Sequence, residues 1–194
     1  IKGMEIRDTP SLCHGTKRNF RTMTMKELES CIEAYGKDIY NFCLHLTKET
    51  EQAEELYQDT FLTAVEIRGR INNTENPKSY LLSICVRLWK NKQRKWAWRN
   101  RISPISTLVE ACNKDVFHED TDTILEAEKI MVVRKSIQKL DDKYRLVVLL
   151  YYMEELSLKQ ISQILHLPTG TIKTRLYTAR KLLKSELEGY FYES

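Results

Sequence analysis

The sequence of 194 residues contains no run of about 18 apolar residues, the length that a membrane-spanning helix needs. No secretory signal peptide is recognisable near its start. Its cysteines are scattered and form no Cys-x-x-Cys pair, so we predict neither a disulfide framework nor a structural zinc site. From these absences we expect a cytoplasmic protein in a reducing compartment that does not insert directly into a membrane.

Catalytic and cofactor motifs are also missing. The four histidines stand apart from one another, and no His-Glu-x-x-His, P-loop or glycine-rich nucleotide motif occurs. The sequence also has no clustered acids for a metal and no His/Cys/Ser arrangement typical of nucleophilic catalysis. We therefore expect a protein that is not an enzyme and that holds no metal and no cofactor.

No segment alternates convincingly between apolar and polar residues with a period of two, so the fold class that we predict is all-α. With 42% hydrophobic and 30% charged residues the chain is predicted to be soluble and folded. Periodicity and charge divide it into two small helical domains, residues 23–98 and 124–190. An N-terminal tail, residues 1–22, and an acidic linker, residues 99–123, lack sustained periodicity, and we expect both to be flexible.

The first domain is predicted to contain three helices. The first begins at a capping box formed by Thr24 and Glu27, and the second follows Thr50. A polar loop rich in amide side chains comes next, and the third helix starts with Asn76 as its N-cap and Pro77 in its first turn.

Beyond Arg87 this third helix becomes basic and carries three tryptophans. Tryptophans among arginines and lysines suit stacking on unpaired bases combined with contacts to phosphates. Packing in the core is an equally good interpretation for Trp89, whereas we expect Trp96 and Trp98 to be exposed. The residues predicted to contact nucleic acid in this helix are Arg87, Lys90, Arg94 and Trp96.

Residues 157–184 show the layout of a helix-turn-helix. Ser157 and Gln160 form a capping box, Pro168 stops the first helix, and Thr169 can cap the second. The segment contains basic residues and no acid, so its outward side is suited to base edges and phosphates. An ordinary helical hairpin with a solvated basic face is the alternative. We favour DNA binding, through Thr169, Thr171, Lys173, Thr174, Arg175, Thr178 and Arg180.

Taken together, these segments resemble the extracytoplasmic-function (ECF) sigma factors of bacterial RNA polymerase, within the sigma-70 family. AEELYQDTFLTA (residues 53–64) resembles the family helix with a Leu-x-Gln-acid core, and NPKSYLLSI (76–84) resembles the start of its promoter-reading helix. Residues 140–183 carry Leu-Pro-x-Gly-Thr-x-Lys-x-Arg-Leu at family spacing and are the most specific match. The resemblance covers Met25 to about Leu187.

The resemblance implies a protein that joins core RNA polymerase, reads an upstream and a downstream promoter element, and helps to melt the latter. The residues that would bind core polymerase are Leu56, Gln58, Asp59 and Leu62. Amide side chains match the edges of bases, and flipping exposes those edges. On this ground the residues that would read an extruded base of the downstream element are Asn72, Asn73 and Asn76.

The partners expected are core RNA polymerase, promoter DNA in duplex and single-stranded form, and an anti-sigma factor that would hold the protein at the membrane. By itself the protein is expected to be monomeric. The acidic linker has two open interpretations, a segment in the path of the nascent RNA or a solvated tether. The alternative function is a helix-turn-helix regulator that works without polymerase, which would predict a dimer and a palindromic site.

Overall fold

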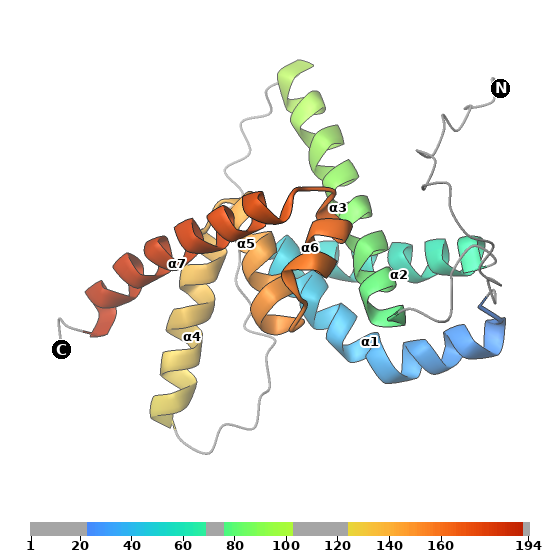
Figure 1. Ribbon diagram of the computed structural model, residues 1–194, viewed down its shortest axis with the longest axis horizontal. Helices are drawn as coiled ribbons and strands as arrows, with labels where there is room; N and C mark the ends of the chain where they lie inside the picture. The colour runs from blue at the N-terminus through green and yellow to red at the C-terminus, as the bar shows by residue number, and fades with distance from the viewer. Residues whose placement is uncertain (1–22, 69–75, 103–123, 192–194) are drawn as a thin grey trace.

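The structure is a computed structural model that describes residues 23–68, 76–102 and 124–191, and every element in these ranges is a helix (Figure 1). The all-α prediction is therefore confirmed. The predicted tail, the loop containing Asn72 and Asn73, and residues 103–123 lie outside the described residues. In chain order the helices are α1 (Met25–Thr47), α2 (Thr50–Ile67), α3 (Pro77–Ile102), α4 (Ile124–Lys139), α5 (Asp142–Val148), the π-helix η2 (Leu149–Met153), α6 (Leu158–Leu165) and α7 (Thr169–Phe191).

Helices α1 to α3 form the N-terminal domain around one apolar core. The predicted capping box starts α1: the Glu27 amide donates to Thr24 Oγ1 over 3.3 Å, and the Thr24 amide donates to Glu27 Oε2 over 2.8 Å. The helix ends where Lys48 takes a left-handed conformation with φ of 70°. Among the largest fully buried apolar side chains of this domain are Leu28, Ile39, Phe42, Leu46, Leu56 and Leu82.

Helix α3 changes character along its length. It begins as predicted, with the Ser79 amide donating to Asn76 Oδ1 over 3.3 Å. Its first half is buried through Leu81, Leu82, Ile84, Cys85, Val86 and Trp89, so Trp89 belongs to the core. Its second half projects beyond the bundle in Figure 1, where Trp96 and Trp98 are exposed as expected. The helix continues to Ile102, so residues 99–102 are helical although the sequence placed them in the linker.

Helices α4 to α7 with η2 form the C-terminal domain, which contains the predicted helix-turn-helix in α6 and α7. The capping box at Ser157 and Gln160 is present. The turn is closed from α6, because Ser162 Oγ donates to the Leu167 carbonyl over 2.6 Å and its own carbonyl accepts from the Leu167 amide over 3.1 Å. Thr169 is the first residue of α7, whereas the sequence suggested it as the cap.

The two domains pack against each other, which the sequence did not predict. Helix α6 lies on α3, η2 lies on α1, and buried side chains of both domains form one apolar cluster. Polar contacts between described residues also cross the boundary. Arg145 Nη2 donates to the Leu46 carbonyl over 3.0 Å, and Lys78 Nζ lies 3.0 Å from Glu154 Oε2.

The capping box at the start of α6 provides a stability test. Replacing Ser157 by Ala removes the acceptor for the Gln160 amide, so the free energy of unfolding should fall by about 0.5–2 kcal/mol. Urea unfolding followed by circular dichroism measures this loss. The control is Ser185→Ala on the exposed side of α7, where alanine favours the helix. Equal stability of the wild type and Ser157→Ala would contradict the role of the cap.

Candidate nucleic-acid and polymerase interfaces

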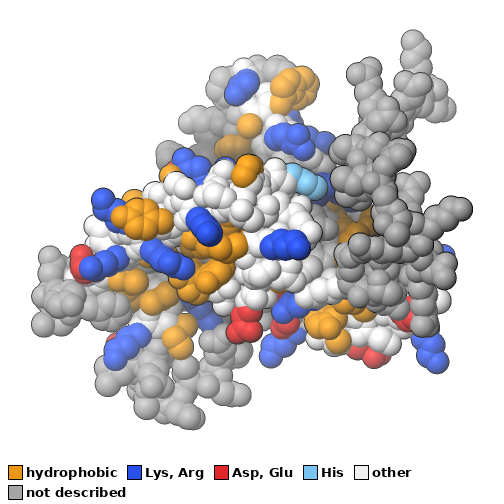
Figure 2. Space-filling model, in the orientation of Figure 1, with side chains coloured by type: hydrophobic (Ala, Val, Ile, Leu, Met, Phe, Trp, Pro, Cys, Tyr) orange, Lys and Arg blue, Asp and Glu red, His pale blue; other side chains and the backbone are white. Residues whose placement is uncertain are grey.

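One side of α7 packs into the core of its domain. Ile172, Leu176 and Ala179 recur at three- and four-residue steps and are buried. The opposite side is therefore presented to solvent, and Figure 2 shows Lys and Arg side chains along it with few acids among them. The exposed residues of this side are Lys173, Thr174, Tyr177, Lys181 and Lys184.

The residues predicted to contact upstream DNA divide into two groups. Thr169, Lys173, Thr174 and Arg180 are exposed, whereas Thr171, Arg175 and Thr178 are half-buried. Two threonine hydroxyls are already used as donors, because Thr174 Oγ1 donates to the Gly170 carbonyl and Thr178 Oγ1 to the Thr174 carbonyl, each over 3.0 Å. Toward DNA these two side chains are thus left mainly with their acceptor lone pairs.

Arg180 is held by the aromatic residues of η2. Its Nε donates to the Tyr152 hydroxyl over 2.7 Å, and its guanidinium lies 5.8 Å from the ring centre of Tyr151 and 5.7 Å from that of Tyr152. These are cation–π distances. Contact of Arg180 with DNA stays a prediction, and any phosphate would have to meet the guanidinium together with its tyrosine partners.

Tyr177 was missed by the sequence reasoning. It is 71% exposed and lies one turn beyond Lys173 and Thr174 on the outward side of α7. Its spacing from Lys173 and Lys181 was the signal that could have found it, because residues four apart share a helix face. A phenol ring and hydroxyl at this place can meet an apolar base edge or a phosphate oxygen.

The basic half of α3 forms the second candidate DNA surface. Arg87, Lys90 and Arg94 follow at three- and four-residue steps on one side; Arg87 and Arg94 are exposed, and Lys90 is half-buried. Burial lowers the pKa of Lys90, and the positive charges of Arg175 and Arg94 lower it further. Arg175 on α7 thus lies near α3, so the two candidate DNA surfaces adjoin each other in this structure.

The candidate polymerase surface lies on α2. Gln58 is exposed, Leu62 is 63% exposed, and Asp59 is partly exposed beside them. Leu56 does not belong to this surface. It is 0% exposed because its side chain faces α1 and α3 in the core, so it supports the helix and does not contact a partner.

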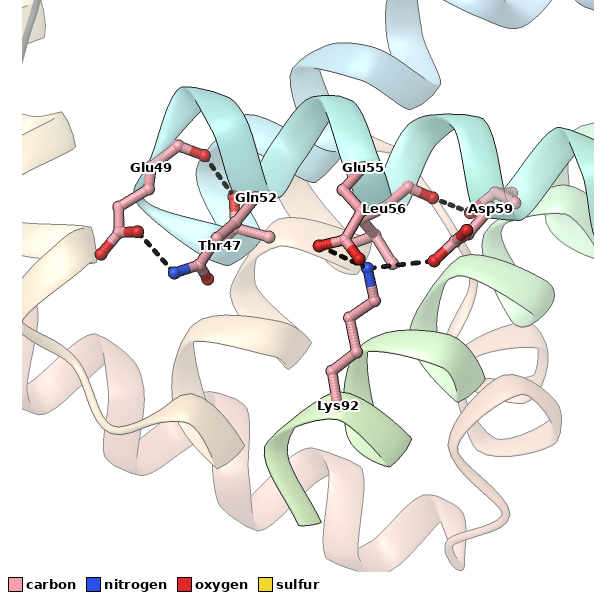
Figure 3. Close-up of polar contacts among 8 residues, drawn as sticks. Thr47, Glu49, Gln52, Glu55, Leu56, Asp59 and Lys92 are labelled. Carbon is pink, nitrogen blue, oxygen red and sulfur yellow. Dashed lines mark hydrogen bonds and ion pairs between the residues drawn. The ribbon is translucent and has the colours of Figure 1, made fainter. Parts of the chain in front are cut away.

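Lys92 links α2 to α3, as Figure 3 shows. Its Nζ lies 3.1 Å from Glu55 Oε2 and 3.0 Å from Asp59 Oδ2. Lys92 follows Cys85 and Trp89 on the side of α3 that faces its neighbours, and so it differs from the outward-facing bases of that helix. Partly exposed ion pairs contribute about 0–1 kcal/mol each, so this link orients the carboxylates more than it stabilises the fold.

In the part of the chain that the structure describes, no three His, Cys, Asp or Glu side chains come together as a metal site. Among the same residues, no helix is long and apolar enough to span a membrane.

Residues 31–99 match the family model for Sigma-70 region 2, and residues 130–183 match the model for Sigma-70 region 4. The chain is 29% identical over 166 residues to the ECF RNA polymerase sigma factor SigW of Bacillus subtilis (strain 168), covering 80% of this chain and 86% of that protein. It is 28% identical over 165 residues to the ECF sigma factor SigM of the same organism, with 84% and 94% covered. The chain belongs to the ECF group of the sigma-70 family.

Solved structures of low identity share the fold of this sigma factor. The sigma factor RpoE of Bartonella quintana, in complex with the anti-sigma factor NepR, superposes with a TM-score of 0.72 at 21% identity, covering 84% of this chain and 98% of that one. CnrH in complex with the cytosolic domain of CnrY gives a TM-score of 0.61 at 15% identity, with 86% and 90% covered.

Family membership gives the sigma factor its general activity. It directs transcription initiation with RNA polymerase and is a non-enzymatic subunit of that assembly. The alternative of a regulator that works without polymerase is therefore set aside. The N-terminal domain is region 2 and the C-terminal domain is region 4.

Proposed function

We propose that this sigma factor divides promoter recognition between its two regions. Helix α7 of region 4 reads the upstream element as duplex, and α3 of region 2, with the amide loop before it, holds the melted strand of the downstream element. The exposed side of α2 binds core polymerase. The observation that carries the proposal is the presence of two basic helices with exposed aromatic residues, one in each region.

The proposal that α7 reads the upstream element rests on the outward side of this helix. A helix fits the major groove of B-DNA, and arginine and lysine are the usual readers of guanine there. Arg175 would read a base, because it is planar and bidentate, whereas Lys173 would contact phosphate. Tyr177, which is exposed on the same side of the helix, would lie between these two residues and the DNA backbone.

The proposal that α3 holds the melted strand of the downstream element rests on the projecting end of this helix. Trp96 is 62% and Trp98 is 65% exposed, and no acidic residue occurs in this half of the helix. Exposed indole rings suit stacking with unpaired bases, and the neighbouring cations suit the phosphates. Asn76 uses its Oδ1 to cap α3, which leaves its amide nitrogen to donate to a base.

The proposal that α2 binds core polymerase rests on Gln58, Asp59 and Leu62. An exposed leucine framed by hydrogen-bonding side chains is typical of a protein interface with an apolar centre and a polar rim. The Asp59 carboxylate pairs with Lys92 of α3 over 3.0 Å and is still partly exposed, which supports a role for it at the rim of this surface.

Further partners follow by analogy with the solved relatives. RpoE was solved with the anti-sigma factor NepR, and CnrH with the cytosolic domain of CnrY. We infer that an anti-sigma factor also restrains this chain. The free sigma factor would then be a cytoplasmic monomer that its anti-sigma factor holds near the membrane.

In vitro transcription with core polymerase tests the proposal. A pool of genomic promoter fragments is transcribed with and without the purified chain, and the start sites are sequenced. We expect the chain to select a subset of promoters that share two spaced elements. Transcription that is independent of the chain, or selected promoters with a single shared element, would contradict the division of recognition.

The first prediction separates base readout from phosphate contact on α7. Arg175→Ala should weaken recognition of the upstream element by about 1–3 kcal/mol and relax selectivity at one position. Lys173→Ala should weaken all sequences alike and reduce the salt slope by about 1. Holoenzyme binding to promoter duplexes over a range of salt concentrations measures both. Normal selectivity of Arg175→Ala would show that the orientation of α7 is wrong.

The second prediction concerns core polymerase. Replacing Gln58 and Asp59 together by Ala should weaken the capture of core enzyme. The circular dichroism spectrum should stay unchanged, because neither side chain is buried and Lys92 retains its ion pair with Glu55. The control replaces Glu29 and Glu33, two exposed residues of α1, by Ala. Capture that is unchanged in the first variant would place the interface elsewhere.

The third prediction concerns promoter opening. Asn72 and Asn73 are both replaced by Ala, and formation of the closed complex should stay intact. Each hydrogen bond to an extruded base is worth about 0.5–1.5 kcal/mol, so the open complex should fall several-fold. Permanganate reactivity of exposed thymines measures opening, and a mobility shift measures the closed complex. Equal loss of both complexes would contradict the role of the loop.

A further inference from the structure

The two exposed tryptophans of α3 lie on opposite sides of the helix. Successive residues of an α-helix are rotated by about 100°, so residues two positions apart point about 160° away from each other. Helix α3 stays helical to Ile102, beyond both Trp96 and Trp98, so this rule applies to the two rings. Both rings are exposed to a similar extent. A single strand that runs along one side of α3 can therefore stack on only one of them.

Trp96 continues the side of α3 that faces the rest of region 2. The residues of this side recur at steps of four, three and four positions and are Cys85, Trp89, Lys92 and Trp96. Cys85 and Trp89 are buried in the core, and Lys92 pairs with acids of α2. Trp96 is exposed because α3 has by then passed beyond the bundle (Figure 1). Its ring thus lies on the side where the acids of α2 would repel phosphates.

Trp98 continues the opposite side, which carries the candidate DNA surface. The residues of this side recur at the same steps and are Arg87, Asn91, Arg94 and Trp98, with Arg101 three positions further. Nη2 of Arg94 donates to Asn91 Oδ1, so Asn91 holds this guanidinium on the outward side. Figure 2 shows hydrophobic and basic side chains together at this end of α3. The outward side therefore combines cations with one indole ring.

Arg94 and Arg101 stand on either side of Trp98 along the helix. With a rise of 1.5 Å per residue, their Cα atoms lie about 6 Å before and about 4.5 Å beyond that of Trp98. Both arginines are exposed. An aromatic face with a cation at each end suits one stacked base together with the phosphates that flank it.

We propose that Trp98 is the stacking residue of region 2 for an unpaired base of the melted strand, and that Arg94 and Arg101 bind the phosphates beside that base. Trp96 was predicted from the sequence to make such a contact, and we assign it to Trp98 instead. The inference rests on the proposed function that α3 holds the melted strand of the downstream element. It selects one of two otherwise similar rings.

The first test follows the two rings by fluorescence. The full chain is titrated with a single-stranded oligomer of thymidylate, because stacking on aromatic rings tolerates any base. Trp96→Leu should retain the quenching of indole emission, which comes from Trp98. Trp98→Leu should lose it and bind the oligomer at least about fivefold more weakly. Equal quenching in the two variants, or none in the wild type, would overturn the proposal.

A conservative variant separates stacking from structure. Trp98→Phe keeps an aromatic face, so it should bind the oligomer nearly as well as the wild type does. The circular dichroism spectra of all these variants should agree, because neither ring is buried. If Trp98→Phe has a native spectrum and binds as weakly as Trp98→Leu, the ring does not act by stacking and the proposal fails.

The arginines are tested through the salt dependence of the same binding. Each phosphate contact to a single strand contributes about −0.7 to the slope of log affinity against log salt concentration. Arg101→Gln should therefore flatten the slope by about 0.7. The matched control is Arg99→Gln, an exposed arginine on the side of Trp96, which should leave the slope unchanged. Equal slopes in these two variants would contradict the assignment of the phosphates.

The last test uses the holoenzyme on a promoter selected in the transcription experiment. Trp98→Leu should lower the permanganate reactivity of exposed thymines several-fold without loss of the closed complex, and Trp96→Leu should open the promoter as the wild type does. If both variants open it normally while the Asn72 and Asn73 double variant does not, this inference fails and the proposed function stands. If all three open it normally, the proposed role of α3 and its loop fails as well.

Discussion

The packing of α3 is the constraint on which the other features depend. Its first half is buried against α1, α2 and α6, so its direction is fixed by both regions. Because the apolar side ends after Trp89, the basic second half must project into solvent as an exposed rod. The proposed melting surface, the acid-bearing side of α2 and the position of region 4 all follow from this one buried contact.

Charge is separated within region 2 by the same helix. Most of the bases of α3 point away from its neighbours, but Lys92 points to α2 and pairs with Glu55 and Asp59. One helix therefore presents cations to solvent on one side and pairs with the acids of α2 on the other. This arrangement supports the proposal that α3 meets DNA and that the acid-bearing side of α2 meets a protein partner.

Local features of the fold were predictable from the sequence. The capping boxes at Thr24 and Ser157, the cap at Asn76 and the helix-turn-helix depend on residues within a few positions of one another, and the structure confirms them. Leu56 was placed at the polymerase surface because the family motif includes it, although its spacing also fitted the core. Burial decides the point, since the side chain is fully enclosed.

The contact between the regions was not predictable in this way. Arg145 and Leu46 are 99 residues apart, and one of the two contacting groups is a backbone carbonyl that carries no sequence signal. Glu154 reads as one more surface acid until the π-helix and the left-handed Glu155 are seen. Tyr177 was missed for a different reason, because an aromatic residue near an apolar stripe is usually assigned to the core.

A distance between the two regions tests the central claim most directly. Spin labels are attached to Glu66→Cys on α2 and Ser185→Cys on α7, both exposed positions, in a chain with Cys13 and Cys112 replaced by Ser. Double electron–electron resonance is then recorded for the free chain and for the holoenzyme on its promoter. We predict one defined distance in the free chain, set by the packing of the two regions, and a clearly different one in the promoter complex. The same distance in both states would contradict a sigma factor whose two regions read two separate promoter elements.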